Sequence, residues 1–274
     1  MSLYPQSIDL AGVGNARELG GYTGADGRAV RPGLLLRTAK LSAATPADLG
    51  KLTSTYHLSA VLDLRTAAEI AADPDPAIPG VEHRHVPILN EGAGLGASVT
   101  GIYQNAPSDR AGSLIAMVRT GLVDPDMYTA ILDDPVSLSG FRDFFRILLE
   151  HPPGRAVLWH CTGGKDRTGA AAVLLLSALG VDRETALGDF ALTNVYAADA
   201  IETMGAAARD RGESDAVVRG VRGLTGVNRA FMESALDHID AKFGSMDGFL
   251  TRPDGLALTG AALARLRDKY LQAR

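Results

Sequence analysis

Cysteine is nearly absent from this chain of 274 residues, which contains a single one, Cys161. One cysteine excludes an intramolecular disulfide and any zinc site built from several cysteines. It also means that an oxidised Cys161 would have no second thiol in the chain to resolve it. A lone cysteine is usually a small buried side chain, so a reactive role for Cys161 has to be argued from its surroundings.

The chain also lacks an excess of basic residues and any long apolar run. Its 27 Lys and Arg residues are outnumbered by 32 Asp and Glu, and the net charge of −5 argues against nucleic-acid binding. The longest strongly apolar stretch, within residues 170–179, is far short of the ~20 residues of a membrane span. Residues 1–6 show no sign of a secretory signal. We expect a cytoplasmic protein, or one exported without an N-terminal signal peptide.

Strand and helix signals alternate along the first two thirds of the chain. Short apolar runs predict strands at residues 34–37, 59–64, 81–88 and 156–159. Helices are predicted to begin at Thr45, Thr66 and Ser139, each an N-cap residue, and further helices at 125–133 and 170–179. Phenylalanines and leucines at helical spacing follow Ser139. This alternation predicts an α/β fold with a central, mostly parallel sheet flanked by helices.

Residues 89–125 and the chain beyond Gly180 do not follow this alternation of strands and helices. Residues 89–125 contain Pro107 and many glycines, which favours a long loop with at most a short helix near 111–120. Beyond Gly180, helices are predicted at 182–192, 197–208, 227–243 and 259–271, with four arginines among glycines at 209–226. We find no internal repeat and no linker, so residues 1–274 are expected to form a single domain.

The most informative stretch joins the 156–159 strand to the next helix and reads Trp159-His160-Cys161-Thr162-Gly163-Gly164-Lys165-Asp166-Arg167-Thr168-Gly169. A helix N-terminus offers unpaired N–H groups to an anion, and paired glycines let a turn curl around it. The Arg167 fork matches two phosphate oxygens. The same positive field should lower the pKa of Cys161. The stretch therefore predicts a phosphate site with a thiolate at its base.

This arrangement supports phosphate-ester hydrolysis in two displacements. Cys161 would attack phosphorus, and water would then attack the phosphocysteine. Phosphate ligands would be the N–H groups of Thr162, Gly163, Gly164, Lys165, Asp166 and Arg167, together with the Arg167 side chain. The Thr168 hydroxyl would stabilise the sulfur as a leaving group. No metal or other cofactor is required for this chemistry.

The motif fits a known signature. Cys161 and Arg167 have the Cys-x5-Arg spacing of protein tyrosine phosphatases and their dual-specificity relatives, and Cys-x-x-Gly-Lys-Asp-Arg-Thr-Gly resembles the bacterial PtpB- and LipA-like group. Further segments match that group, with Ala16 in place of an aromatic residue: Asn15-x-Arg17-Glu18-Leu19-Gly20-Gly21, Arg31-Pro32-Gly33-x-Leu35-x-Arg37 and Asp63-Leu64-Arg65. The resemblance implies the tyrosine phosphatase fold, phosphotyrosine or phosphoinositide substrates, and a helical lid around residues 193–226.

The proton donor for the leaving group stays open. The family pattern places a candidate Asp after the strand at 81–88, but this chain has Asn90 there. We therefore favour Asp166, beside the phosphate, with Asp63 or a carboxylate from residues 89–126 as alternatives. Lys165 is either a second anionic contact, suited to a further phosphate on an inositol ring, or a solvated charge.

Some polar residues near the motif are expected to have structural roles, and two rival functions are considered for the whole protein. His160 is expected to orient the loop rather than act as an acid or base. Arg17, Arg37 and Arg65 are expected to form ion pairs near the loop rather than to contact substrate. For the whole protein, a catalytically silent pseudophosphatase that holds phosphorylated ligands and a rhodanese-like sulfurtransferase are the rivals, although intact Cys161 and Arg167 favour an active phosphatase. We expect a monomer.

Overall fold

A five-stranded sheet lies at the centre of the computed structural model, which describes residues 7–105, 109–119, 121 and 125–273. Pro107, which contributed to the loop predicted at 89–125, lies outside these ranges. Residues 1–6, in which the sequence shows no secretory signal, lie outside them as well. The strand order is β1-β2-β5-β3-β4, with β1 antiparallel to β2 and all other neighbours parallel. The strands are β1 Arg17–Glu18, β2 Leu35–Thr38, β3 Leu58–Asp63, β4 Glu82–His85 and β5 Ala156–His160. The predicted mostly parallel sheet is confirmed.

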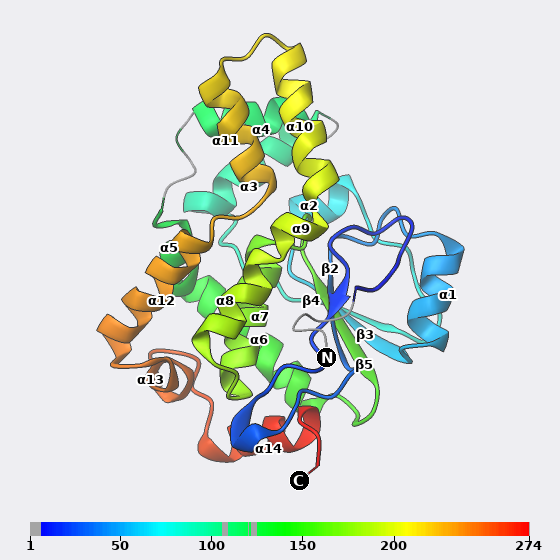
Figure 1. The fold of residues 1–274 in the computed structure, drawn as a ribbon, viewed down its shortest axis with the longest axis vertical. Helices are drawn as coiled ribbons and strands as arrows, with labels where there is room; N and C mark the ends of the chain where they lie inside the picture. Colours follow the sequence, from blue (N-terminus) through cyan, green and yellow to red (C-terminus); the bar gives the residue numbers. More distant parts are fainter. Residues whose placement is uncertain (1–6, 106–108, 120, 122–124, 274) are drawn as a thin grey trace.

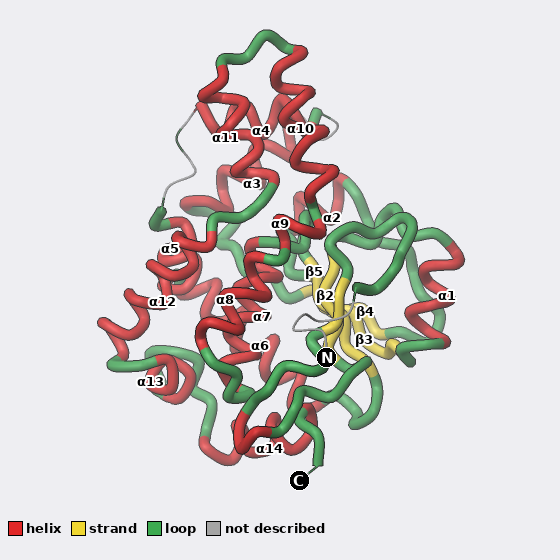
Figure 2. Tube along the Cα trace, in the orientation of Figure 1, coloured by secondary structure: helices red, strands yellow, loops and turns green. Residues whose placement is uncertain are grey.

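Helices cover both faces of the sheet (Figures 1 and 2). They are α1 Pro46–Ser54, α2 Ala67–Ala72, α3 Gly94–Asn105, α4 Arg110–Arg119, α5 Met127–Asp133, α6 Pro135–Glu150, α7 Asp166–Ala178, α8 Arg183–Ala191, α9 Thr193–Tyr196, α10 Ala198–Asp210, α11 Asp215–Thr225, α12 Arg229–Phe243, α13 Met246–Thr251 and α14 Gly260–Tyr270, with a short 3₁₀ turn at Ala25–Gly27. Within the described residues, no helix is both long and apolar enough to cross a bilayer.

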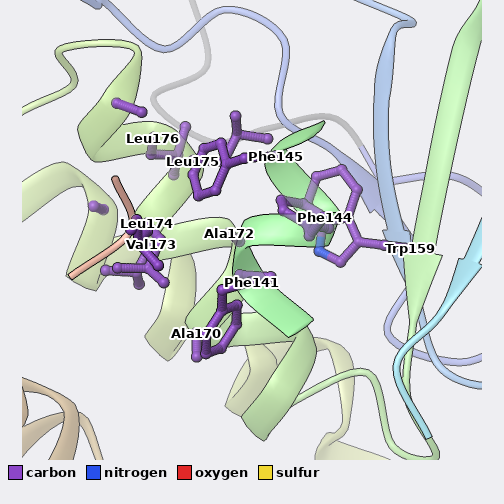
Figure 3. Close-up of a cluster of buried hydrophobic side chains, with 14 of the residues drawn as sticks. Phe141, Phe144, Phe145, Trp159, Ala170, Ala172, Val173, Leu174, Leu175 and Leu176 are labelled. Carbon is purple, nitrogen blue, oxygen red and sulfur yellow. The ribbon is translucent and has the colours of Figure 1, made fainter. Parts of the chain in front are cut away.

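Strand β5 occupies the middle of the sheet because all five of its residues can be buried. Its side chains alternate between two apolar cores, as strand geometry requires. Val157 and Trp159 join the larger core with α6 and α7, whereas Leu158 joins a smaller one beneath α1. Figure 3 shows the larger core, where Phe144 meets Trp159 edge-on at 5.5 Å between ring centroids. The loop after β5 therefore starts from the most rigid part of the molecule.

Two predicted boundaries are wrong. Helix α6 begins at Pro135 rather than after Ser139, because Asp134 caps it by accepting from the N–H groups of Val136 and Ser137. The phenylalanine stripe itself is buried as predicted. Strand β4 covers only Glu82–His85, and these four polar residues are exposed at the sheet edge.

Two glycine-bearing segments, one of them expected to be a long loop, contain helices. Residues 89–125 hold α3 and α4, of which only α4 was expected, and the arginine-bearing segment 209–226 holds α11. Helix α11 packs against α10 and α4. Together these three helices, here called the satellite helices, bury a separate small core of Ile115, Ala208, Val218 and Val221. This tertiary packing keeps α11 helical despite the glycines that it contains, in line with the helical lid that the family resemblance implied. In Figure 1 the satellite helices lie together above the sheet.

Candidate active site

The P-loop, residues 161–167, runs from the end of β5 to the first turn of α7. Gly164 has φ of +65°, and a Cβ on it would lie 2.3 Å from the carbonyl oxygen of Thr38, so only glycine fits here. The Gly164 carbonyl accepts from Asn15 Nδ2 at 2.8 Å and from Arg37 at 3.0 Å. Strand β2 and the residues before β1 therefore hold the loop in its curled shape.

The N–H groups of the P-loop are available to an anion. Across the described ranges, no backbone hydrogen bond outside the helices takes its donor from residues 162–167. Lys165 is the N-cap residue of α7, and its side chain accepts no capping hydrogen bond from the N–H groups of the first helical turn. The helix dipole adds positive potential at the same point. The geometry is that of an anion-binding turn, as the glycine spacing predicts.

Cys161 lies at the base of this loop and is only 2% exposed. Burial alone would raise the pKa of the thiol. The charge of Arg167, together with the polar groups of Thr168, outweighs burial, so the pKa of Cys161 lies below its ordinary value. The structure thus places Cys161, Arg167 and Thr168 together at the base of the loop.

Glu69 belongs to the site and was missed in the sequence. Its carboxylate forms a two-point pair with Arg167, at 2.5 Å to one terminal nitrogen and 2.7 Å to the other, and it accepts from the Thr162 hydroxyl at 2.5 Å. Burial opposes the charged form, but Arg167 and these hydrogen bonds lower the pKa of Glu69 to about 2. Glu69 also completes the capping box of α2 with Thr66. The capping role was the only one that the sequence pattern could reveal.

Asp166 is held by two side chains at the rim of the loop. Its Oδ1 accepts from the Tyr128 hydroxyl at 2.6 Å, and its Oδ2 pairs with the Lys165 ammonium. Lys165 therefore contacts its own neighbour in the free protein and is not simply a solvated charge. Tyr128 comes from α5, in a part of the chain that no motif marked as functional.

Buried ion pairs lie beneath the P-loop, and we call them the base network. Arg17 and Arg37 both pair with Asp189 of α8, at 3.0 and 2.5 Å, and all three side chains are fully buried. The buried neighbourhood and the charge of Arg17 lower the pKa of Arg37 to about 10. The expectation that these arginines form ion pairs near the loop is confirmed.

A second part of the base network centres on Arg65. This side chain pairs with Asp63 at 2.7 Å and with Asp75 at 2.9 Å, and Asp75 in turn lies 2.9 Å from His160 Nε2. The other imidazole nitrogen donates to the Cys161 carbonyl at 3.1 Å. Although burial opposes a charged imidazole, the Asp75 and Asp63 carboxylates raise the pKa of His160. His160 therefore orients the loop from below, as expected.

Comparisons with known proteins agree with this geometry. A model of the tyrosine phosphatase family matches residues 8–272. The chain belongs to the tyrosine phosphatase family. It is 32% identical over 262 residues to a Cupriavidus necator protein named "Putative tyrosine-protein phosphatase", covering 94% of this chain and 86% of that one. It is 26% identical over 284 residues to the triple specificity protein phosphatase PtpB of Mycobacterium tuberculosis, covering 96% of this chain and 98% of that one.

The family makes this phosphatase a Cys-dependent phosphoric monoester hydrolase that acts on phosphorylated substrates. Membership argues against the sulfurtransferase reading, and nothing favours the catalytically silent one. The fold, with its mostly parallel sheet between helices, is consistent with the tyrosine phosphatase fold.

Three of the alternative acid candidates, Asp63, Glu91 and Asp109, are engaged in other contacts, and Asp124 lies outside the described residues. Asn90 accepts from the Gly92 N–H at 3.1 Å and shapes the turn before α3. Both oxygens of Asp63 accept from Arg65. Within residues 89–126, Glu91 accepts from the N–H of Ala67 at 2.7 Å, and Asp109 pairs with Arg211. Of the weighed candidates, Asp166 is the one that belongs to the P-loop itself.

Proposed function

We propose that this protein hydrolyses phosphotyrosine, with Cys161 as the nucleophile. The observation that carries the proposal is the convergence on one short loop of a thiol with a lowered pKa, the Arg167 guanidinium and unused N–H groups. In the first step, sulfur attacks phosphorus and the phosphoryl group passes to Cys161. Charge on the equatorial oxygens is met by the N–H groups of residues 162–167 and by Arg167.

Arg167 is held ready for that charge by its pair with Glu69. A guanidinium has five N–H donors, and the two-point pair with Glu69 engages only part of them. The carboxylate fixes the plane of the fork, so little ordering remains to be done when a phosphate arrives. The buried Thr168 hydroxyl has no hydrogen-bond partner among the described residues, so it is free to donate to the sulfur and support its departure in the second step, when water attacks the phosphocysteine.

Asp166 is the proposed donor of the proton to the leaving phenol. It is the first residue of α7, directly before Arg167, and its charge acts on Cys161. Replacing it by Asn should slow phenyl phosphate, whose leaving group needs a proton, far more than p-nitrophenyl phosphate, whose leaving group does not. Equal losses for the two substrates would remove Asp166 from this role.

A phosphotyrosine ester suits the depth of the site. The nucleophile is 2% exposed, so the phosphate has to be carried inwards on a long and narrow group. The relative named a triple specificity phosphatase supports extending the substrate range beyond phosphotyrosine to other phosphorylated side chains and phosphoinositides. Lys165 would then leave Asp166 for a second anionic group on such a substrate.

We also propose that residues 1–274 act as one domain whose satellite helices form a lid over the site. The separate core of these helices supports a unit that can shift as a body. Two of the four arginines in this segment are engaged within it, Arg211 with Asp109 and Arg222 with Glu202. In the free protein these two side chains are therefore paired with carboxylates at the surface.

The experiment that tests the main proposal is turnover of p-nitrophenyl phosphate in the presence of a chelator, for the wild type and for Cys161→Ser. We expect turnover by the wild type and a loss of at least about 10³-fold in the variant. A Ser variant that kept most of the activity would remove Cys161 as the nucleophile. A panel of phosphopeptides and soluble inositol phosphates then ranks the substrate classes.

A further inference from the structure

Asp166 accepts a hydrogen bond from Tyr128. Among the described residues, Tyr128 is the one donor to Asp166 that lies outside the P-loop and α7. The distance between the hydroxyl and Oδ1 is 2.6 Å, in the range of a bond to a charged acceptor. Tyr128 is 38 residues away in sequence and belongs to α5, in a region with no recognisable motif. The inference drawn from this contact rests on the proposed role of Asp166 as proton donor.

The Tyr128 hydroxyl is fixed in place. The residue is 1% exposed, and its ring packs edge-on against Phe190 of α8 with 5.4 Å between centroids. A tyrosine side chain has only two torsion angles, and both are restrained when the ring is enclosed. The carboxylate of Asp166, at 25% exposure, has no such enclosure of its own. Its orientation at the rim therefore depends on its partners.

The hydroxyl acts as a donor throughout the working pH range. Burial, together with the charges of Asp166 and Cys161, raises the pKa of Tyr128 well above its ordinary value. A permanent donor at Oδ1 has a direct chemical consequence. Oδ1 remains an acceptor when Asp166 is protonated, so the acid proton resides on Oδ2. That oxygen is also the one that Lys165 contacts in the free protein.

We propose that Tyr128 is a positioning residue for the leaving-group proton. Its hydroxyl holds Oδ1 of Asp166 and leaves Oδ2 as the oxygen that carries the proton. When Oδ2 takes up a proton from solvent, its ion pair with the Lys165 ammonium is lost. In the transfer step, a bond forms between sulfur and phosphorus, the bond from phosphorus to the phenolic oxygen breaks, and the Oδ2 proton passes to that oxygen. Asp166 ends the step as a carboxylate, still held by Tyr128.

The test uses Tyr128→Phe, which removes one oxygen and keeps the ring against Phe190. The value of kcat/KM, which reports on transfer to Cys161, is measured for phenyl phosphate and for p-nitrophenyl phosphate. We expect a loss of about 10-fold for phenyl phosphate and less than about 2-fold for p-nitrophenyl phosphate. Inhibition by inorganic phosphate should be unchanged, because the P-loop itself is untouched. In an Asp166→Asn background, the Tyr128 change should have no further effect.

Tyr270→Phe is the matched control. Its hydroxyl is also buried and donates to the Leu148 carbonyl at 2.9 Å, and Tyr270 belongs to α14 rather than to the site. This variant should leave the ratio of the two substrates unchanged even if it melts at a lower temperature. A leaving-group preference that Tyr270→Phe altered equally would contradict a specific role for Tyr128.

The outcomes separate the inference from the function beneath it. If Asp166→Asn is selective for phenyl phosphate but Tyr128→Phe slows both substrates equally, Asp166 remains the acid and the role of Tyr128 is overturned. Additive losses in the double variant overturn it as well. If Asp166→Asn is itself not selective, the acid assignment and the positioning role both fail, while Cys161→Ser still tests the nucleophile.

Discussion

The base network and the satellite helices both use arginine–carboxylate pairs, but they differ in burial. Arg37 and Asp189 beneath the P-loop are fully buried, whereas Arg211 and Asp109 in the satellite helices are 44% and 49% exposed. A buried pair cannot lose one partner without leaving a charge in a medium of low dielectric. An exposed pair is solvated on both sides and contributes little. The same chemistry therefore fixes geometry in one region and leaves it adjustable in the other.

The largest effect is expected from Asp189→Ala. This change leaves Arg17 and Arg37 buried without their shared carboxylate, and Arg37 also holds the Gly164 carbonyl. We expect a loss of about 3–5 kcal/mol in the free energy of unfolding, measured in urea. Turnover of p-nitrophenyl phosphate should fall even at low temperature, where the variant is still folded. A loss below about 1 kcal/mol would show that the base network is not what sets the loop.

A smaller effect is expected at Glu69, and it depends on pH. The pKa of Glu69 is about 2 in the folded protein, against 4.5 for the unperturbed group, so the carboxylate stabilises the fold above pH 4.5. That contribution is lost as the pH falls through the folded value. A shift of this size corresponds to about 3 kcal/mol.

The prediction is tested with Glu69→Gln by urea unfolding between pH 5 and 2. We expect the variant to show a shallower loss of stability over this interval than the wild type. Glu184→Gln is the control, because Glu184 pairs with Arg229 at the surface with 72% of its side chain exposed. Identical pH slopes for the wild type and Glu69→Gln would contradict a depressed pKa at this site.

Sequence reasoning reached the P-loop and the sheet but not the residues that complete the site. Cys161, Arg167 and Thr168 lie within eight consecutive residues, so local spacing carries their chemistry. Glu69 and Tyr128 reach the loop only through the fold. Their local patterns predicted nothing beyond a helix cap and a helix, because contacts between distant elements leave no periodic signal. For the same reason, residues 89–125 were assigned to a loop from their glycines, although α3 forms there and packs against α2.

The stability of the cores in the two regions can be compared by replacing one buried valine in each with alanine. Val61 of β3 and Val221 of α11 are both fully buried, the first in the core beneath α1 and the second in the small core of the satellite helices. Each change to alanine should cost about 1–2 kcal/mol. For Val61→Ala we expect the loss in global unfolding in urea. For Val221→Ala we expect it as faster amide hydrogen exchange confined to α4, α10 and α11. Global unfolding that weakened equally in both variants would show that the satellite helices are not a separate unit.

The smallest effect is expected from Asp109→Asn, which removes the carboxylate from the exposed pair with Arg211. The Arg211 side chain keeps the pKa of Asp109 below its ordinary value, yet both groups remain in water, where counterions replace the lost partner. We expect a melting temperature within the scatter of replicate measurements and an unchanged kcat/KM for p-nitrophenyl phosphate. The wild-type melting temperature should likewise respond little to added salt through this pair. If Asp109→Asn instead lowered stability as Asp189→Ala does, burial would not be what distinguishes the two regions. The satellite helices would then be as firmly fixed as the base of the P-loop, and their movement as a lid would have to be given up.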